Sequence, residues 1–101
     1  MRMIMLVQCP IEPFNTLVRN GTVGEKMRQI LDATKPESAY FTERDGHRGA
    51  IFVVNVDGAS DVARLAEPWF LQFNAEVEFR IAMTPEELGR ADLAAQGKKW
   101  A

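Results

Sequence analysis

The sequence predicts an α+β fold with one four-stranded antiparallel sheet. Three observations indicate it. The elements follow the order strand, helix, strand, strand, helix, strand; Asp45-Gly46 marks a tight hairpin between the second and third strands; and an acidic helical segment follows the last strand. With 101 residues, 47% of them hydrophobic and 26% charged, the chain fits a single domain over residues 1–101, in which residues 95–101 form a peripheral tail.

The first strand is predicted over residues 1–8. Apolar side chains occupy both its odd and its even positions, which point to opposite faces, as in an inner strand contacted from both sides. Pro13 suits the first turn of the helix that follows. Asn20-Gly21 interrupts this helix, and Thr22 with Glu25 forms a predicted capping box that restarts it. The first helical region is therefore expected in two pieces.

Two strands joined by the hairpin come next. Lys35-Pro36 ends the first helical region, and the second strand is predicted over residues 38–43. Both residues of Asp45-Gly46 tolerate the positive φ that a two-residue hairpin turn needs. The third strand, residues 49–56, is nearly all apolar, and Asp57-Gly58 ends it. This third strand is expected to be central to the stability of the fold.

The second long helix begins at Ala59 or Ser60, with the charge of Asp61 in its first turn, where it suits the helix dipole. Pro68 falls inside the helical pattern. Because proline removes a backbone donor and clashes with the preceding turn, it predicts a kink or a break within residues 65–67.

Residues 76–82 alternate between an apolar and a charged face, and Thr84-Pro85 starts the short final helix. The complete βαββαβ order, with a tight hairpin between strands two and three, is the ferredoxin-like arrangement. Two helices can cover one face of its sheet, whereas the strands are apolar on more than one face. The sequence therefore predicts a homodimer that packs through the sheet faces.

The last third of the chain combines an aromatic-Asn pair, a Glu-aromatic strand and an acidic helix, in residues 73–81 (FNAEVEFRI) and 84–88 (TPEEL). In this stretch and in its element order the chain resembles the dimeric α+β-barrel superfamily, and most of all a family of small uncharacterised bacterial domains within it. The resemblance implies two sheets facing each other around a central cavity. It implies no single activity, because the superfamily includes cofactor-free monooxygenases, isomerases, haem enzymes and ligand-sensing modules.

Charge and composition argue against two classes of partner. The formal charge of -2 gives no general attraction to phosphate backbones or anionic lipid. RNA-recognition domains share this element order, but here Ala50 and Asn55 stand where their stacking aromatics belong. The apolar run at residues 1–7 stops far short of a signal-peptide core or a membrane span. We expect no nucleic-acid partner and no membrane association.

Cys9 is the only cysteine and His47 the only histidine. A lone cysteine forms no internal disulfide, which favours the cytoplasm, and Cys9 is interpreted as a buried inert thiol rather than a nucleophile. One histidine and no glycine-rich phosphate loop leave too few ligands for an internal site. We therefore expect no metal and no cofactor, with haem held by His47 as the single exception.

The candidate ligand-binding residues are those whose alternation puts a polar group on a sheet face that can line a dimer cavity. Glu78 and Arg80 share one face of the fourth strand, where they either fix a polar ligand at the subunit seam or form a solvated edge. Tyr40 is the phenol candidate on the second strand. His47 is either a solvated loop side chain or an acid/base group reaching across the cavity.

Three functions remain open from the sequence. One is a cofactor-free enzyme of monooxygenase or isomerase type, the second a non-catalytic ligand-binding or sensing module, and the third a structural dimerisation module with a packed interior. No catalytic residue can be assigned. Because most inward positions are apolar, any ligand is expected to be largely apolar with one or two polar groups. Arg44 and Arg48, which flank the hairpin, are predicted to be solvated.

Overall fold

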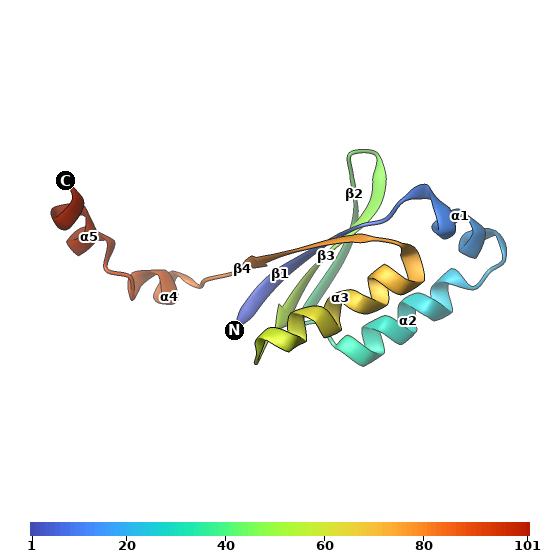
Figure 1. Cartoon of the computed structure of the whole chain (residues 1–101), viewed down its shortest axis with the longest axis horizontal. Coiled ribbons are helices and arrows are strands. Elements are labelled where there is room, and N and C mark those ends of the chain that lie inside the picture. Colours follow the sequence, from blue (N-terminus) through green and yellow to red (C-terminus); the bar gives the residue numbers. More distant parts are fainter.

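The computed structural model describes residues 1–101 and consists of a four-stranded antiparallel sheet with helices packed on one of its faces (Figure 1). The strand order is β2-β3-β1-β4, so that β1 and β3 are central. The four strands match the predicted ranges to within two residues. No helix combines the length and the apolar composition needed to cross a membrane. The elements are β1 (Arg2–Gln8), α1 (Ile11–Arg19), α2 (Val23–Thr34), β2 (Ser38–Arg44), β3 (His47–Asn55), α3 (Ala59–Phe73), β4 (Glu76–Ile81), α4 (Pro85–Gly89) and α5 (Leu93–Trp100).

The hydrophobic core lies between the sheet and the helices, because each strand sends alternate side chains to that face. In β1 these are the odd-numbered residues 3–7, all of them buried methionine or valine. Phe52 of β3 is 1% exposed and lies on Trp69 of α3, with ring centroids 5.2 Å apart. Trp69 stacks in turn on Phe73 at 5.5 Å. This row of aromatic rings joins the central strand to the longest helix.

The opposite face of the sheet, called the open face below, is the face that α2 and α3 leave uncovered. The register pairs Ile4 with Val53 and Leu6 with Ile51, so four apolar side chains of β1 and β3 adjoin on it. All four are at least partly exposed to solvent. The prediction that the central strands are apolar on both faces is confirmed.

The hairpin between β2 and β3 has the predicted two-residue turn. Asp45 has φ 53° and Gly46 has φ 75°, and both are positive as the sequence requires. Because the loop is this short, β2 and β3 extend to Arg44 and His47, one and two residues past their predicted ends. The turn therefore fixes the register of the hairpin over its whole length.

Helix α2 begins at Val23, where the sequence predicts a restart, but the predicted capping box is wrong. The backbone N–H and the hydroxyl of Thr22 both donate to Asn20 Oδ1, at 3.1 and 2.6 Å. Glu25 lies beside Arg28 instead of reaching back to the helix start. The Thr22 N–H, which a capping box would pair with the Glu25 carboxylate, is thus already bonded to Asn20.

Helix α3 runs without interruption from residue 59 to residue 73, so the break predicted within residues 65–67 is wrong. Pro68 has no N–H to donate to the carbonyl oxygen of Arg64, one turn earlier. Arg64 lies on the exposed side of the helix, where water can satisfy that carbonyl. On the buried side, Trp69 and Phe73 hold the helix against the sheet.

Residues 82–101, called the C-terminal arm below, project from the end of β4 and give the molecule its extents of 60 × 28 × 19 Å (Figure 1). The first helix of the arm, α4, starts as predicted, with Thr84 Oγ1 accepting a hydrogen bond from the Glu87 N–H at 3.1 Å. The tail predicted over residues 95–101 is helical as far as Trp100. Neither α4 nor α5 contains a buried residue.

Candidate ligand site on the open face

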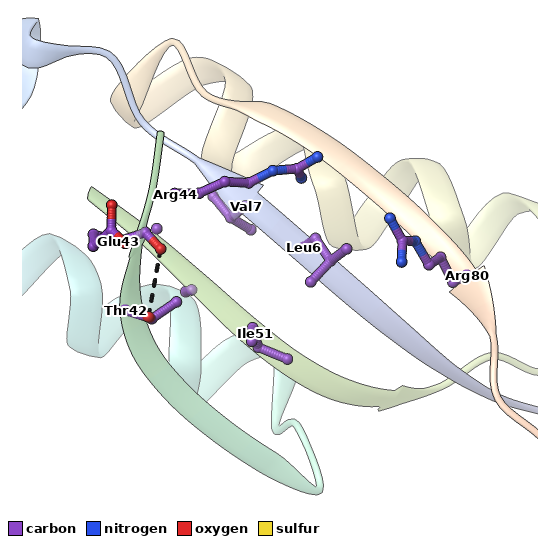
Figure 2. Close-up of a pocket in the computed structure, with 9 residues that line it drawn as sticks. Leu6, Val7, Thr42, Glu43, Arg44, Ile51 and Arg80 are labelled. Atoms are coloured by element: carbon purple, nitrogen blue, oxygen red, sulfur yellow. Dashed lines mark hydrogen bonds between the residues drawn. The ribbon is translucent and has the colours of Figure 1, made fainter. Parts of the chain in front are cut away.

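The open face carries a hollow of about 360 Å³, within the range of roughly 300–1,000 Å³ that small-molecule sites occupy. Leu6 and Ile51 form its apolar floor from paired positions on β1 and β3. Arg44 and Arg80 flank this floor from the two edge strands, and both side chains are directed over it (Figure 2). The other lining residues are Val7, Thr42, Glu43, Gly49 and Ala50.

Glu78 links the two arginines. Its Oε2 accepts a hydrogen bond from Arg44 Nη1 at 3.3 Å, and its Oε1 accepts one from Arg80 Nη2 at 3.5 Å. Because Arg44 lies on β2 and Glu78 on β4, the first of these pairs spans the open face above both central strands. The hydrogen bond from Arg44 and the charge of Arg80 lower the pKa of Glu78 below its ordinary value. The three groups together therefore carry one net positive charge at neutral pH.

Three of the predicted site residues lie on the open face. Glu78 and Arg80 share one face of β4, as their alternation predicts, and Arg80 lines the hollow while Glu78 pairs with it from outside the lining. Tyr40 lies on the same face at the position paired with Ile51, beside the floor of the hollow but outside its lining. It is 67% exposed, so its ring and hydroxyl are open to contact from above the sheet.

His47 does not join this group. Its Nδ1 lies 3.1 Å from the carbonyl oxygen of Asp45 in the hairpin turn. The side chain lines a separate hollow together with Pro10 and Asn15 at the start of the first helical region. Although the register pairs His47 with Arg44, the structure does not place it beside Glu78.

Cys9 is 4% exposed, and burial raises the pKa of its thiol, an effect that the nearby positive charge of Arg48 partly opposes. A thiol with a raised pKa is protonated at neutral pH and is a poor nucleophile. No group of three or more His, Cys, Asp and Glu side chains is arranged to hold a metal ion. On the open face, Arg44, Glu78 and Arg80 offer ionic contact and the floor of the hollow offers apolar contact.

Arg44 is exposed, as predicted, but the sequence reasoning missed its ion pair with Glu78 and its place in the hollow. The available signal was alternation, since Arg44 shares its face of β2 with Tyr40 and Thr42. Alternation does not show how the twisted sheet brings the end of β2 within reach of β4. Arg48 is exposed, as predicted, and its Cζ lies over the ring of Phe14, 4.4 Å from the ring centroid.

Replacing Arg44 with glutamine is expected to raise the pKa of Glu78 toward the ordinary carboxyl value of 4.5. A lowered pKa means that the pair stabilises the native state at neutral pH, and that this contribution is lost as the pH falls from 4.5 through the folded-state pKa. Carboxyl carbon titration by NMR measures the change. Glu87 is the internal control, because hydrogen bonds from Thr84 lower its pKa and the substitution leaves them intact. An unchanged Glu78 titration would contradict the ion pair.

No protein-family model and no curated protein matches the chain. Among solved structures it is similar to the de novo designed protein Ferredog-Diesel, with 14% sequence identity and a TM-score of 0.43 over 79% of this chain and 83% of the designed one. A similarity of this size says nothing about what the chain binds.

Proposed function

We propose that the chain is a ferredoxin-like protein that forms a homodimer through its open faces and binds, between them, a small and largely apolar molecule with one anionic group. The observation that carries this proposal is the hollow on the open face. Its floor of Leu6 and Ile51 is apolar, and it is lined by two guanidinium groups that both pair with the carboxylate of Glu78 just outside the lining. The strand order and the placement of both long helices on one face support the fold assignment.

The apolar centre of the open face supports self-association. Contiguous exposed apolar patches rimmed by polar residues mark interaction sites in soluble proteins. The rim carries both signs of charge on β2 and β4, so a second copy can meet each charge with its opposite. The apolar patch consists of Ile4, Leu6, Tyr40, Ile51 and Val53, and the charged rim of Arg2, Arg44, Glu76, Glu78 and Arg80.

The C-terminal arm supports the same conclusion independently. It projects from the sheet and exposes several large apolar side chains that have no cover within the chain, including Trp100 at 75% exposure. Burying such side chains against a second copy is favourable by about 25 cal/mol per Å² of apolar surface. The others are Met83, Leu88 and Leu93. In the proposed dimer the arm of each subunit lies on the other subunit.

The charges around the hollow define the ligand. The guanidinium N–H groups of Arg44 and Arg80 that Glu78 leaves unpaired are available to a carboxylate, sulfonate or phosphate. Glu43, the carboxylate in the lining itself, accepts a hydrogen bond from the Gly46 N–H in the hairpin turn. The floor accepts the apolar body of the molecule. In the dimer two hollows face each other, so the second subunit excludes water from the ligand and strengthens its ionic contacts.

The dimer is tested by replacing Leu6 with aspartate. The wild-type chain is expected to scatter light as twice the chain mass at micromolar concentration, and Leu6→Asp as a monomer, because the substitution puts a charge in the middle of the apolar patch. Leu71→Asp is the matched control: Leu71 is 72% exposed on α3, away from the open face, and its substitution leaves the dimer intact. A monomeric wild-type chain would contradict the dimer.

Ligand binding is tested with 8-anilinonaphthalene-1-sulfonate, an apolar fluorophore with one anionic group. Arg80→Gln is expected to weaken its binding about tenfold, the loss of roughly 1.5 kcal/mol that removal of a charge-assisted hydrogen bond causes. Arg64→Gln on α3 is the control with unchanged affinity, and near-UV circular dichroism verifies that each variant keeps its packing. A dimer that binds no fluorophore would favour the structural dimerisation module.

A further inference from the structure

A second hollow, of about 330 Å³, lies on the helix side of the sheet beneath the β2–β3 hairpin. The helices leave a gap at this end, because α2 and α3 cover the central strands and not the outer part of β2 (Figure 1). Phe41 of β2 shows this directly: it points to the helix side and contacts Phe52, yet it remains 56% exposed. The lining residues are Val7, Cys9, Phe14, Met27, Phe41, Thr42, Arg48, Gly49, Ala50 and Trp69.

The only charged group in this lining is the guanidinium of Arg48. Its Cζ lies over the Phe14 ring, 4.4 Å from the ring centroid, which holds the side chain by a cation–π contact. No carboxylate lies within 4.0 Å of it, and its N–H groups make no hydrogen bond within the chain. A guanidinium stacked on a ring keeps its N–H edge free for a planar anion.

Trp69 supplies the second polar group. It is 1% exposed, and its indole Nε1–H has no acceptor among the protein atoms. Buried donors in native proteins are nearly always paired, and an unpaired one is unfavourable. Trp69 lines this hollow and its Nε1 is enclosed, so a bound molecule would satisfy the N–H by placing an acceptor between the side chains that cover it.

We propose that this hollow, called the hairpin pocket below, binds a small aromatic carboxylate. The carboxylate pairs with the guanidinium edge of Arg48, the ring packs among Phe14, Met27 and Phe41, and an oxygen at the far end of the ligand accepts the hydrogen bond from Trp69. The site lies on the other side of the sheet from the open-face hollow, and its lining is complete within one subunit. Its occupation does not depend on the proposed dimer.

The test uses 4-hydroxyphenylacetate, which has the carboxylate, the ring and an inner oxygen. The chain has two tryptophans, and Trp100 in α5 is 75% exposed and outside the pocket. In ¹⁵N-correlated NMR spectra the indole N–H signal of Trp69 should move downfield in a saturable titration, while the Trp100 signal stays in place. Phenylacetate, without the inner oxygen, should bind more weakly and leave the Trp69 N–H signal without the downfield shift.

Arg48→Gln should weaken 4-hydroxyphenylacetate binding at least tenfold. The neutral analogue 2-(4-hydroxyphenyl)ethanol should bind the wild type and this variant equally, because it has no charge for Arg48 to recognise. Arg90→Gln in the C-terminal arm is the matched control with unchanged affinity. A Trp69 signal that stays in place at millimolar 4-hydroxyphenylacetate would overturn the proposal, as would an Arg48→Gln variant that binds the compound as tightly as the wild type.

Discussion

Replacing Phe52 with alanine is expected to lower the free energy of unfolding by about 3–5 kcal/mol. Phe52 is 1% exposed at the centre of the sheet and contacts aromatic rings on two sides. Its ring lies edge-on to Phe41 at 6.1 Å and tilted on Trp69 at 5.2 Å. The substitution removes both contacts and leaves a cavity that β3 and α3, each held by its other neighbours, cannot collapse to fill. Urea unfolding followed by far-UV circular dichroism measures the change.

Phe70→Ala is the matched control for this prediction. Phe70 follows Trp69 on α3 but is 41% exposed, so the same change of side chain removes less buried surface and leaves no enclosed cavity. It is expected to cost less than about 1.5 kcal/mol. If Phe52→Ala unfolded at the same urea concentration as the parent chain, the assignment of this face of β3 to the core would be wrong.

Local rules were sufficient to predict most of the fold. Asp45-Gly46 specifies a two-residue turn, and that turn sets the register of β2 on β3. The alternation in residues 76–82 correctly placed Glu78 and Arg80 on one face. In these segments the side-chain period and the turn chemistry agree, so little depends on distant parts of the chain.

Tertiary packing decided the features that local rules did not predict. Pro68 ought to break α3 by its own chemistry, but the buried ring of Trp69 holds the helix in place, and Arg64, whose carbonyl oxygen loses its donor, lies on the exposed side of the helix. Arg44 and Arg48 both read as solvated hairpin residues. Arg44 reaches across the open face to Glu78 because the sheet twists. Arg48 lies over Phe14 because the first helical region packs beside the hairpin. Twist and helix placement are properties of the assembled layers, and alternation along one strand does not reveal them.

Replacing Gly49 with alanine is expected to cost about 1–3 kcal/mol of stability, as overpacking a tight site does. A Cβ atom at this position would lie 2.8 Å from the backbone carbonyl oxygen of Val7, closer than real Cβ contacts come. That oxygen belongs to β1 and cannot move aside alone, so β3 must shift relative to β1. Urea unfolding measures the loss. Gly24→Ala is the control: its Cβ has no neighbour within 4 Å, and alanine in α2 is expected to be neutral or slightly stabilising.

The same substitution tests how the backbone positions the open-face site. Gly49 lies between the hairpin turn and the core, so a shift of β3 there carries the end of β2 with it, and Arg44 moves relative to Glu78. The pKa of Glu78 should then rise in Gly49→Ala even though no charged residue has changed. If stability fell but Glu78 titrated as in the parent chain, the flexible side chain of Arg44 would have kept its ion pair with Glu78 despite the shift of the strand. The close approach of β1 and β3 would then be a requirement of the fold alone and not of the site.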